Sequence, residues 1–191
     1  MDVLRLVLII FLFAFSLGEL ARFGLGNNFY IKLVDLVIPV LVLVWIATNL
    51  KRWKNNLNFK DNLLLPITLV TVVFLASLIL NIKNFSANEL FVAFSYILRW
   101  ISYASLYFIV KSLAPKFKEK IIYLLIGVGA LFTLFGFIQY FFYSSLRNLY
   151  YLGWDDHMHR MFSTFLDPNF AGAFFVLYLF LLLGILLYLL N

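Results

Sequence analysis

The stretch FAGAFFVLYLFLLLGILLYLL, residues 170–190, contains no charged residue and decides the fold class. About 20 apolar residues in a helix cross the ~30 Å hydrocarbon core of a bilayer, so the stretch predicts a transmembrane helix. The whole composition agrees, because 64% of the 191 residues are hydrophobic and only 13% are charged. In soluble domains roughly half of the residues are hydrophobic and about a quarter are charged. We therefore expect an integral membrane protein of the all-α class, whose helices satisfy their own backbone hydrogen bonds in lipid.

Five further apolar runs precede this stretch and bring the number of predicted spans to six. The spans are expected at residues 3–20, 33–50, 63–82, 90–113, 121–142 and 170–190. They predict one polytopic helical domain over residues 1–191, with an outer loop at 143–169. Because the chain stops directly after the sixth run, we expect it to be the N-terminal half of a larger bundle.

The basic residues predict the orientation in the membrane, since cytoplasmic loops carry an excess of Lys and Arg. One side has nine of them: Arg5, Lys51, Arg52, Lys54, Lys60, Lys111, Lys116, Lys118 and Lys120. The other side has five: Arg22, Lys32, Lys83, Arg147 and Arg160. Both termini are therefore expected in the cytoplasm. The net charge of +6 fits topology and contact with anionic headgroups better than nucleic-acid binding. Cysteine is absent, which excludes disulfides and thiol chemistry.

The most polar stretch, DDHMHRMFSTFLDPNFAG at residues 155–172, lies in the long outer loop and at the start of the last span. It allows three interpretations: a solvated connector, a metal site or a site for an anionic substrate. His157 and His159, with aspartates nearby, are suitable ligand types for a metal. However, histidines two positions apart share a face only in a strand, and no second ligand cluster exists. We favour the anionic substrate and predict no metal and no cofactor.

The residues before the last span predict how that helix begins. Asp167 is a typical N-cap, and Pro168 suits the first helical position. The start of a helix attracts anions, although Asp167 partly neutralises it. Arg160, seven residues upstream, is close enough in sequence to reach the same place.

Three ionisable residues set into or beside the apolar runs fall in the outer half of the membrane. Arg99 is expected about 13 Å below the outer end of the fourth span, Asp35 in the first turn of the second and Glu19 at the end of the first. A charge near a helix centre costs about 2.5–3.5 kcal/mol on insertion scales. Arg99 therefore either forms a buried ion pair with Asp35 or Glu19, or lines an outward-facing cavity that receives an anion.

Residues 160–169, RMFSTFLDPN, together with Ala171 and the following apolar helix, resemble the signature of the O-antigen ligase and O-antigen polymerase-like membrane proteins. In that family an Arg precedes a small-Thr-Phe stretch and an Asn/Asp-Pro-Asn that opens a transmembrane helix. Asp35 in IKLVDLVIP and Arg99 in YILRWISY also resemble the family. By hydropathy the resemblance covers essentially the whole chain, and residues 160–171 are its specific part.

The resemblance implies a glycosyltransferase of the bacterial cell envelope. Such proteins take a glycan from an undecaprenyl-pyrophosphate carrier at the outer face of the cytoplasmic membrane and pass it to lipid A core, polysaccharide or protein. Carried over, Arg160 contacts the pyrophosphate as the catalytic arginine, with Arg99 and Asn169 as further substrate-binding residues. Asp35, Asp167 and Pro168 have structural or orienting roles.

The chain also departs from the family pattern. Family members have roughly twice as many spans, and an outer loop of their second half supplies a histidine that His157 and His159 do not replace. Two other classes of function stay open. A transporter or flippase fragment predicts broken helices, for which the glycines at 127, 129 and 136 are a weak sign. A non-catalytic assembly subunit predicts a docking surface in loop 144–169.

Overall fold

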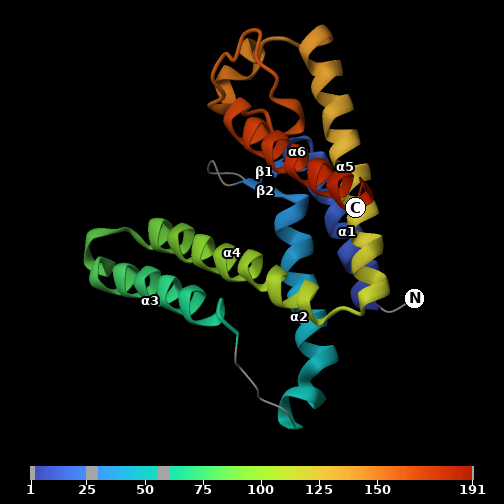
Figure 1. Cartoon of the computed structure of the whole chain (residues 1–191). Coiled ribbons are helices and arrows are strands. Elements are labelled where there is room, and N and C mark those ends of the chain that lie inside the picture. The colour runs from blue at the N-terminus through green and yellow to red at the C-terminus, as the bar shows by residue number, and fades with distance from the viewer. Residues whose placement is uncertain (1–2, 25–29, 56–60, 191) are drawn as a thin grey trace. The chain divides into compact units, whose positions relative to one another are not determined.

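The computed structural model describes residues 3–24, 30–55 and 61–190, and these residues are overwhelmingly helical (Figure 1). The α-helices are α1 (Val3–Leu17), α2 (Leu33–Asn55), α3 (Leu64–Leu80), α4 (Ala87–Ser112), α5 (Pro115–Phe142) and α6 (Pro168–Leu190). Short 3-10 helices are η1 (Gly18–Ala21), η2 (Ile82–Asn84), η3 (Arg147–Leu152) and η4 (Ser163–Phe165). The prediction of an all-α polytopic bundle is confirmed, and the chain is a multi-pass membrane protein.

Five of the six predicted spans are long and apolar enough to cross a membrane. The third, α3, has 17 residues, which is about 25 Å at the helical rise and the lower limit for a span. Two helices begin earlier than their apolar runs. Ser86 caps α4 through a capping box with Glu89, so the helix starts at Ala87. Pro115 occupies the first position of α5, which then continues through the polar residues 116–120.

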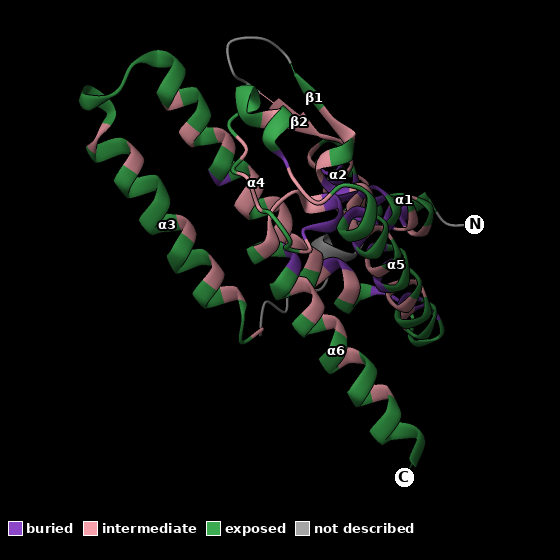
Figure 2. Ribbon diagram, turned by 90° about the horizontal axis from the view of Figure 1, so that it is seen from above, coloured by how far each residue is buried: buried purple, intermediate pink, exposed green. Residues whose placement is uncertain are grey.

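The described residues form two compact units, each of which is considered by itself. Unit 1 comprises Met1–Leu4 and Ile38–Ala114, and unit 2 comprises Arg5–Val37 and Pro115–Asn191. Figure 2 shows that α3 and most of α4 are exposed or half-buried, whereas the buried residues gather around α1 and α5. In a membrane protein, exposed apolar helix surface is the part that lipid covers.

The centre of unit 1 is the hairpin of α3 and α4, which lie side by side (Figure 1). The indole Nε1 of Trp100 donates to Thr71 Oγ1 at 3.1 Å, and its ring meets Phe74 edge-on at 5.8 Å between centroids. At the open end of the hairpin, Lys111 Nζ donates to Asp61 Oδ2 at 2.5 Å. Aromatic packing and two polar contacts therefore hold the hairpin, although no residue of α3 is buried.

Unit 2 has an aromatic core around Phe132 of α5, which is fully buried. Its ring lies 4.5 Å from those of Phe165 and Phe174, measured between centroids. One face of α5 presents small residues to its neighbours. The ring of Tyr178 fills the space above Gly129, and Met161 packs against Gly136. The helix break that the transporter alternative predicts is not found: α5 is continuous, and these two glycines allow close packing instead.

A contact at each end of unit 2 shows that α1 and α5 run parallel. Near their starts, the guanidinium of Arg5 lies 5.3 Å from the ring centroid of Phe117. Near the end of α1, η4 joins the two helices: Thr164 Oγ1 donates to the Ser16 carbonyl of α1 at 2.9 Å, and Ser163 Oγ donates to the Phe132 carbonyl of α5 at 2.6 Å. Parallel helices agree with the predicted topology, in which both run outward.

The structure adds a β-hairpin that the sequence did not predict. Strands β1 (Arg22–Gly24) and β2 (Tyr30–Lys32) pair antiparallel, with Arg22 opposite Lys32. Like charges directly opposite each other destabilise a hairpin. Glu19 resolves this conflict because its carboxylate, whose side chain is 9% exposed, pairs with Lys32 and lies 3.7 Å from Arg22.

Candidate functional site

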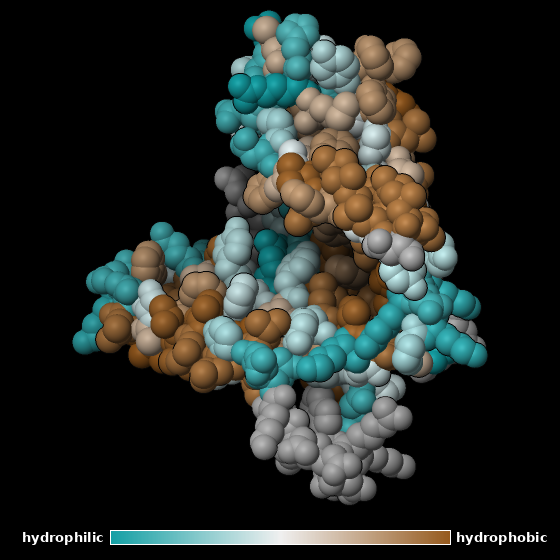
Figure 3. Space-filling view, viewed as in Figure 1, coloured by the Kyte–Doolittle hydropathy of each residue, from teal (hydrophilic) through white to brown (hydrophobic). Residues whose placement is uncertain are grey.

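One end of unit 2 brings together polar residues from several elements. They come from the end of α5, the following loop, the start of α6 and the hairpin before α2. Figure 3 shows the loop as a mostly hydrophilic surface beside the hydrophobic surface of α6. This end is the outer one in the predicted topology, so it is the candidate site.

Arg160 has an exposed side chain in this loop. Within the described part of the chain, its guanidinium forms no ion pair and no hydrogen bond to another side chain. Its backbone, in contrast, is held on both sides: the N–H donates to the His157 carbonyl at 3.1 Å, and the carbonyl accepts from Gln139 Nε2 at 3.3 Å. A planar cation on a fixed backbone is suited to bind phosphate oxygens in two-point fashion.

Gln139 is a site residue that the sequence analysis missed. It lies in α5, is 7% exposed and uses its whole hydrogen-bonding capacity. Nε2 donates to the carbonyls of Tyr143 and Arg160, and Oε1 accepts the N–H groups of Phe162 and Ser163 at 2.8 and 3.2 Å. One signal could have found it: it is the only glutamine of the chain, and it stands in an apolar span.

The loop around Arg160 has a strained backbone. His159, Ser163 and Leu166 have φ values of 56°, 49° and 53°. Each such non-glycine residue in the left-handed region costs on the order of 1–2 kcal/mol. Surrounding contacts offset this cost, among them the 2.6 Å hydrogen bond from Ser163 Oγ to the Phe132 carbonyl. Strain of this kind concentrates at functional sites.

The predicted start of the last helix is confirmed. Pro168 is the first residue of α6, and Asp167 Oδ1 accepts the N–H groups of Asn169 and Phe170 at 2.7 and 3.2 Å. The cap has a consequence for the site: the carboxylate of Asp167 occupies two of the free amides that could have bound an anion. Arg160 is therefore a better candidate to bind an anion than the amides of this helix start. The side chain of Asn169 is exposed beside the cap.

The polar residues at 155–159 serve mainly to shape the loop. Asp156 accepts from Ser145 Oγ and Arg147 Nε, both at 2.8 Å, which ties the beginning of the loop to its middle. The ring of His157 lies 6.4 Å from that of Phe162. Over the described residues, no three His, Asp or Glu side chains are arranged to hold a metal ion.

Contacts of the hairpin connect it to the same loop. The guanidinium carbon of Arg22 lies 3.8 Å from the ring centroid of Tyr30 and 5.4 Å from that of Trp154 in the loop. Glu19 is therefore paired inside unit 2. Asp35, in the first turn of α2, accepts the backbone N–H of Lys32 at 3.4 Å, a contact that fixes the start of that helix. These contacts support an orienting role for Asp35.

Arg99 lies in unit 1, in the middle of α4. It is 12 residues after Ala87, or about 18 Å along the helix, because α4 begins before its apolar run. Its guanidinium carbon lies 5.3 Å from the ring centroid of Tyr96. Arg99 and Arg160 belong to different units, so their joint action stays a prediction.

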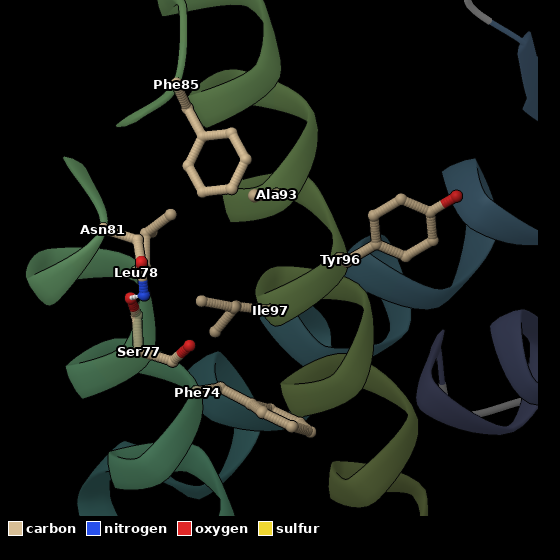
Figure 4. Close-up of a pocket in the computed structure, with 8 residues that line it drawn as sticks. All are labelled: Phe74, Ser77, Leu78, Asn81, Phe85, Ala93, Tyr96 and Ile97. Carbon is tan, nitrogen blue, oxygen red and sulfur yellow. Dashed lines mark hydrogen bonds between the residues drawn. The ribbon is translucent and has the colours of Figure 1, made fainter. Parts of the chain in front are cut away.

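A pocket of about 490 Å³ opens between α3 and α4 (Figure 4). It is lined by Phe74, Ser77, Leu78, Asn81, Phe85, Ala93, Tyr96 and Ile97. The lining is mainly apolar, with Ser77 and Asn81 as its polar members. In a lipid environment such a pocket suits an acyl or isoprenoid chain. Arg99 does not line the pocket; it lies over Tyr96, whose ring is turned away from α3 (Figure 4).

Comparisons with protein families, with curated proteins and with solved structures found no match to this chain.

Proposed function

We propose that the chain is part of a membrane glycosyltransferase of the O-antigen ligase/polymerase type. It transfers a glycan from an undecaprenyl-pyrophosphate carrier to a glycan, lipid or protein acceptor at the outer face of a bacterial cytoplasmic membrane. The observation that carries the proposal is the exposed guanidinium of Arg160, which forms no ion pair within the described residues although its backbone is held on both sides. The resemblance of residues 160–171 to the family signature supplies the substrate class.

The chemistry needs little more than positioning and charge stabilisation. When the glycan is transferred, the oxygen of an acceptor hydroxyl forms a bond to the anomeric carbon, and the hydroxyl proton is released to water. The bond between the anomeric carbon and the pyrophosphate oxygen breaks, and its two electrons stay on the departing lipid pyrophosphate. An arginine that donates two parallel hydrogen bonds stabilises this charge. Arg160 is the catalytic residue in this proposal. Asn169 is a neighbouring binding residue, and neither a metal nor a cofactor is required.

Features of unit 1 support the lipid part of the substrate. The apolar pocket between α3 and α4 has room for part of an isoprenoid chain. The resemblance implies that Arg99, in the same unit, is a further substrate-binding residue. In unit 2, Asp35 and Asp167 orient the starts of α2 and α6.

The experiment that tests the proposal is the binding of a short-chain polyprenyl pyrophosphate to the chain in nanodiscs. Loss of a charge-assisted hydrogen bond costs about 1.5–3 kcal/mol, so Arg160→Ala should weaken binding roughly 10- to 150-fold. Arg160→Lys keeps the charge without the planar fork and should give an intermediate loss. Arg147→Ala is the matched control, because this arginine of the same loop is 70% exposed and pairs with Asp156.

Normal binding by a folded Arg160→Ala variant would refute the pyrophosphate assignment and favour a non-catalytic subunit that docks through the loop. A transporter instead predicts that the lipid moves across the membrane. In proteoliposomes, flipping of the lipid without glycan transfer by the full-length protein would support that alternative.

A further inference from the structure

We infer that Gln139 is a positioning residue that determines where the Arg160 guanidinium lies. This inference rests on the proposed function of Arg160 and adds a residue of a different helix to the same site. Gln139 does not reach the guanidinium. It holds the peptide group that carries Arg160 and the two N–H groups that follow.

The geometry of the amide supports this role. A carboxamide has two N–H donors and an oxygen with two lone pairs. All four are used, with distances between 2.8 and 3.3 Å. Three of the four bonds go to residues 160–163, and the fourth goes to the Tyr143 carbonyl, one turn further along the chain. The amide thus fastens both the start and the end of the loop to α5.

The position of the amide adds a second argument. Gln139 is 7% exposed and lies in a membrane-spanning helix, where a polar side chain is costly unless it is fully paired. The Tyr143 carbonyl directly follows the end of α5, whereas residues 160–162 belong to no helix or strand and Ser163 only begins the short η4. One buried amide therefore replaces secondary structure just where the backbone is strained, at His159 and Ser163.

Two alternatives at this end of unit 2 explain less. In the Glu19, Arg22 and Lys32 cluster both cations already pair with the carboxylate of Glu19, so neither is left without an anionic partner. The N-terminus of α6 is occupied by Asp167. Of these three features, the Gln139 contacts are the ones that act directly on the backbone of Arg160, the residue assigned to the substrate.

Limited trypsin digestion tests, without any ligand, whether Gln139 holds the backbone at Arg160 in place. Trypsin cleaves after arginine, but only where the backbone can open locally. In Gln139→Met all four hydrogen bonds are lost, and cleavage after Arg160 should accelerate about tenfold or more. Cleavage after Arg147, which lies in the same loop but has no contact with Gln139, should not change. Equal rates of cleavage after Arg160 in the wild type and in Gln139→Met would overturn the inference.

Lipid binding by the same variants tests the positioning role. Gln139→Met should bind the short-chain polyprenyl pyrophosphate about tenfold more weakly, although Arg160 itself is intact. Gly129→Ala is the matched control: it disturbs the packing of the same helix but touches no residue of 160–163. It should lower the melting temperature without a matching loss of affinity or a faster cleavage after Arg160. Unchanged binding by Gln139→Met would overturn the positioning role even where cleavage is faster.

A pH profile separates positioning from bulk stability. In Gln139→Glu the new carboxylate cannot donate to the Arg160 carbonyl, whereas its protonated form has one O–H to donate. The affinity ratio of variant to wild type should therefore recover when the pH is lowered far enough to protonate the new carboxylate. An affinity ratio that does not change with pH would contradict the positioning role of Gln139. If wild type fails to bind the lipid at all, the proposed function fails, while the trypsin result still decides whether Gln139 holds the loop.

Discussion

Thr164 and Ser16 are joined by a buried hydrogen bond although 148 positions separate them: Thr164 Oγ1 donates to the Ser16 carbonyl at 2.9 Å. Ser16 belongs to the last turn of α1, where carbonyl groups have no partner within the helix. The hydroxyl of Thr164 supplies the missing donor. This contact attaches the loop that carries Arg160 to the first helix of the chain.

Thr164→Val should therefore destabilise the protein. Valine has nearly the same shape but leaves the Ser16 carbonyl buried without this donor, which costs about 1–3 kcal/mol. Thermal unfolding in detergent measures the effect. Thr68→Val is the matched control, since the hydroxyl of Thr68 is exposed and bonds only within its own helix. Equal melting temperatures for the two variants would contradict the importance of the contact.

Gly18 should tolerate no side chain. Its φ is +52°, and an added Cβ would lie 2.5 Å from the Thr164 carbonyl oxygen. Backbone strain and overpacking together should make Gly18→Ala less stable by on the order of 3 kcal/mol. Gly184→Ala offers the contrast, because nothing lies within 4 Å of its Cβ position. Compared with glycine, alanine also stabilises a helix by up to about 1 kcal/mol. The prediction fails if Gly18→Ala unfolds at the wild-type temperature.

Glu19→Gln should destabilise the hairpin and make its stability depend on salt. Without the carboxylate, Arg22 and Lys32 face each other as like charges, at a cost of about 1–2 kcal/mol. Added salt screens this repulsion, so the variant should regain stability between low and high ionic strength. Glu119→Gln, at an exposed position, is the control. A variant that shows no gain in stability with salt would argue against the pairing.

Protonation of Asp61 should occur below the ordinary range of a carboxyl. The ammonium of Lys111 and the backbone N–H of Leu63 donate to its carboxylate and lower its pKa. A lowered pKa in the folded state stabilises the fold above the ordinary value, and this contribution is lost as the pH falls through the lowered one. Carboxyl carbon NMR measures the titration. Lys111→Met should raise the pKa of Asp61, whereas Lys116→Met should leave it in place.

The sequence predicts the helices well because their physical cause is local. Apolar runs of membrane-spanning length form α1, α2 and α4–α6, and the Asp167-Pro168 pair marks the start of α6. Long-range pairing was not predictable in the same way. The strands of the hairpin that pairs Arg22 with Lys32 have three residues each, too few to show an alternating pattern. The role of Gln139 depends on backbone groups more than 20 positions away.

Two glycines of α5 should respond oppositely to the same substitution. A Cβ at Gly129 would lie 2.1 Å from the ring of Tyr178, whereas a Cβ at Gly127 meets nothing within 4 Å. The ring cannot move freely, because the Tyr178 hydroxyl donates to the Ile126 carbonyl at 3.0 Å. Gly129→Ala should therefore lower the free energy of unfolding by about 1–3 kcal/mol, and Gly127→Ala should leave it equal or raise it slightly. Thermal unfolding of both variants in one detergent makes the comparison. If Gly129→Ala is as stable as Gly127→Ala, this result would contradict the close packing of α6 on α5 at Gly129.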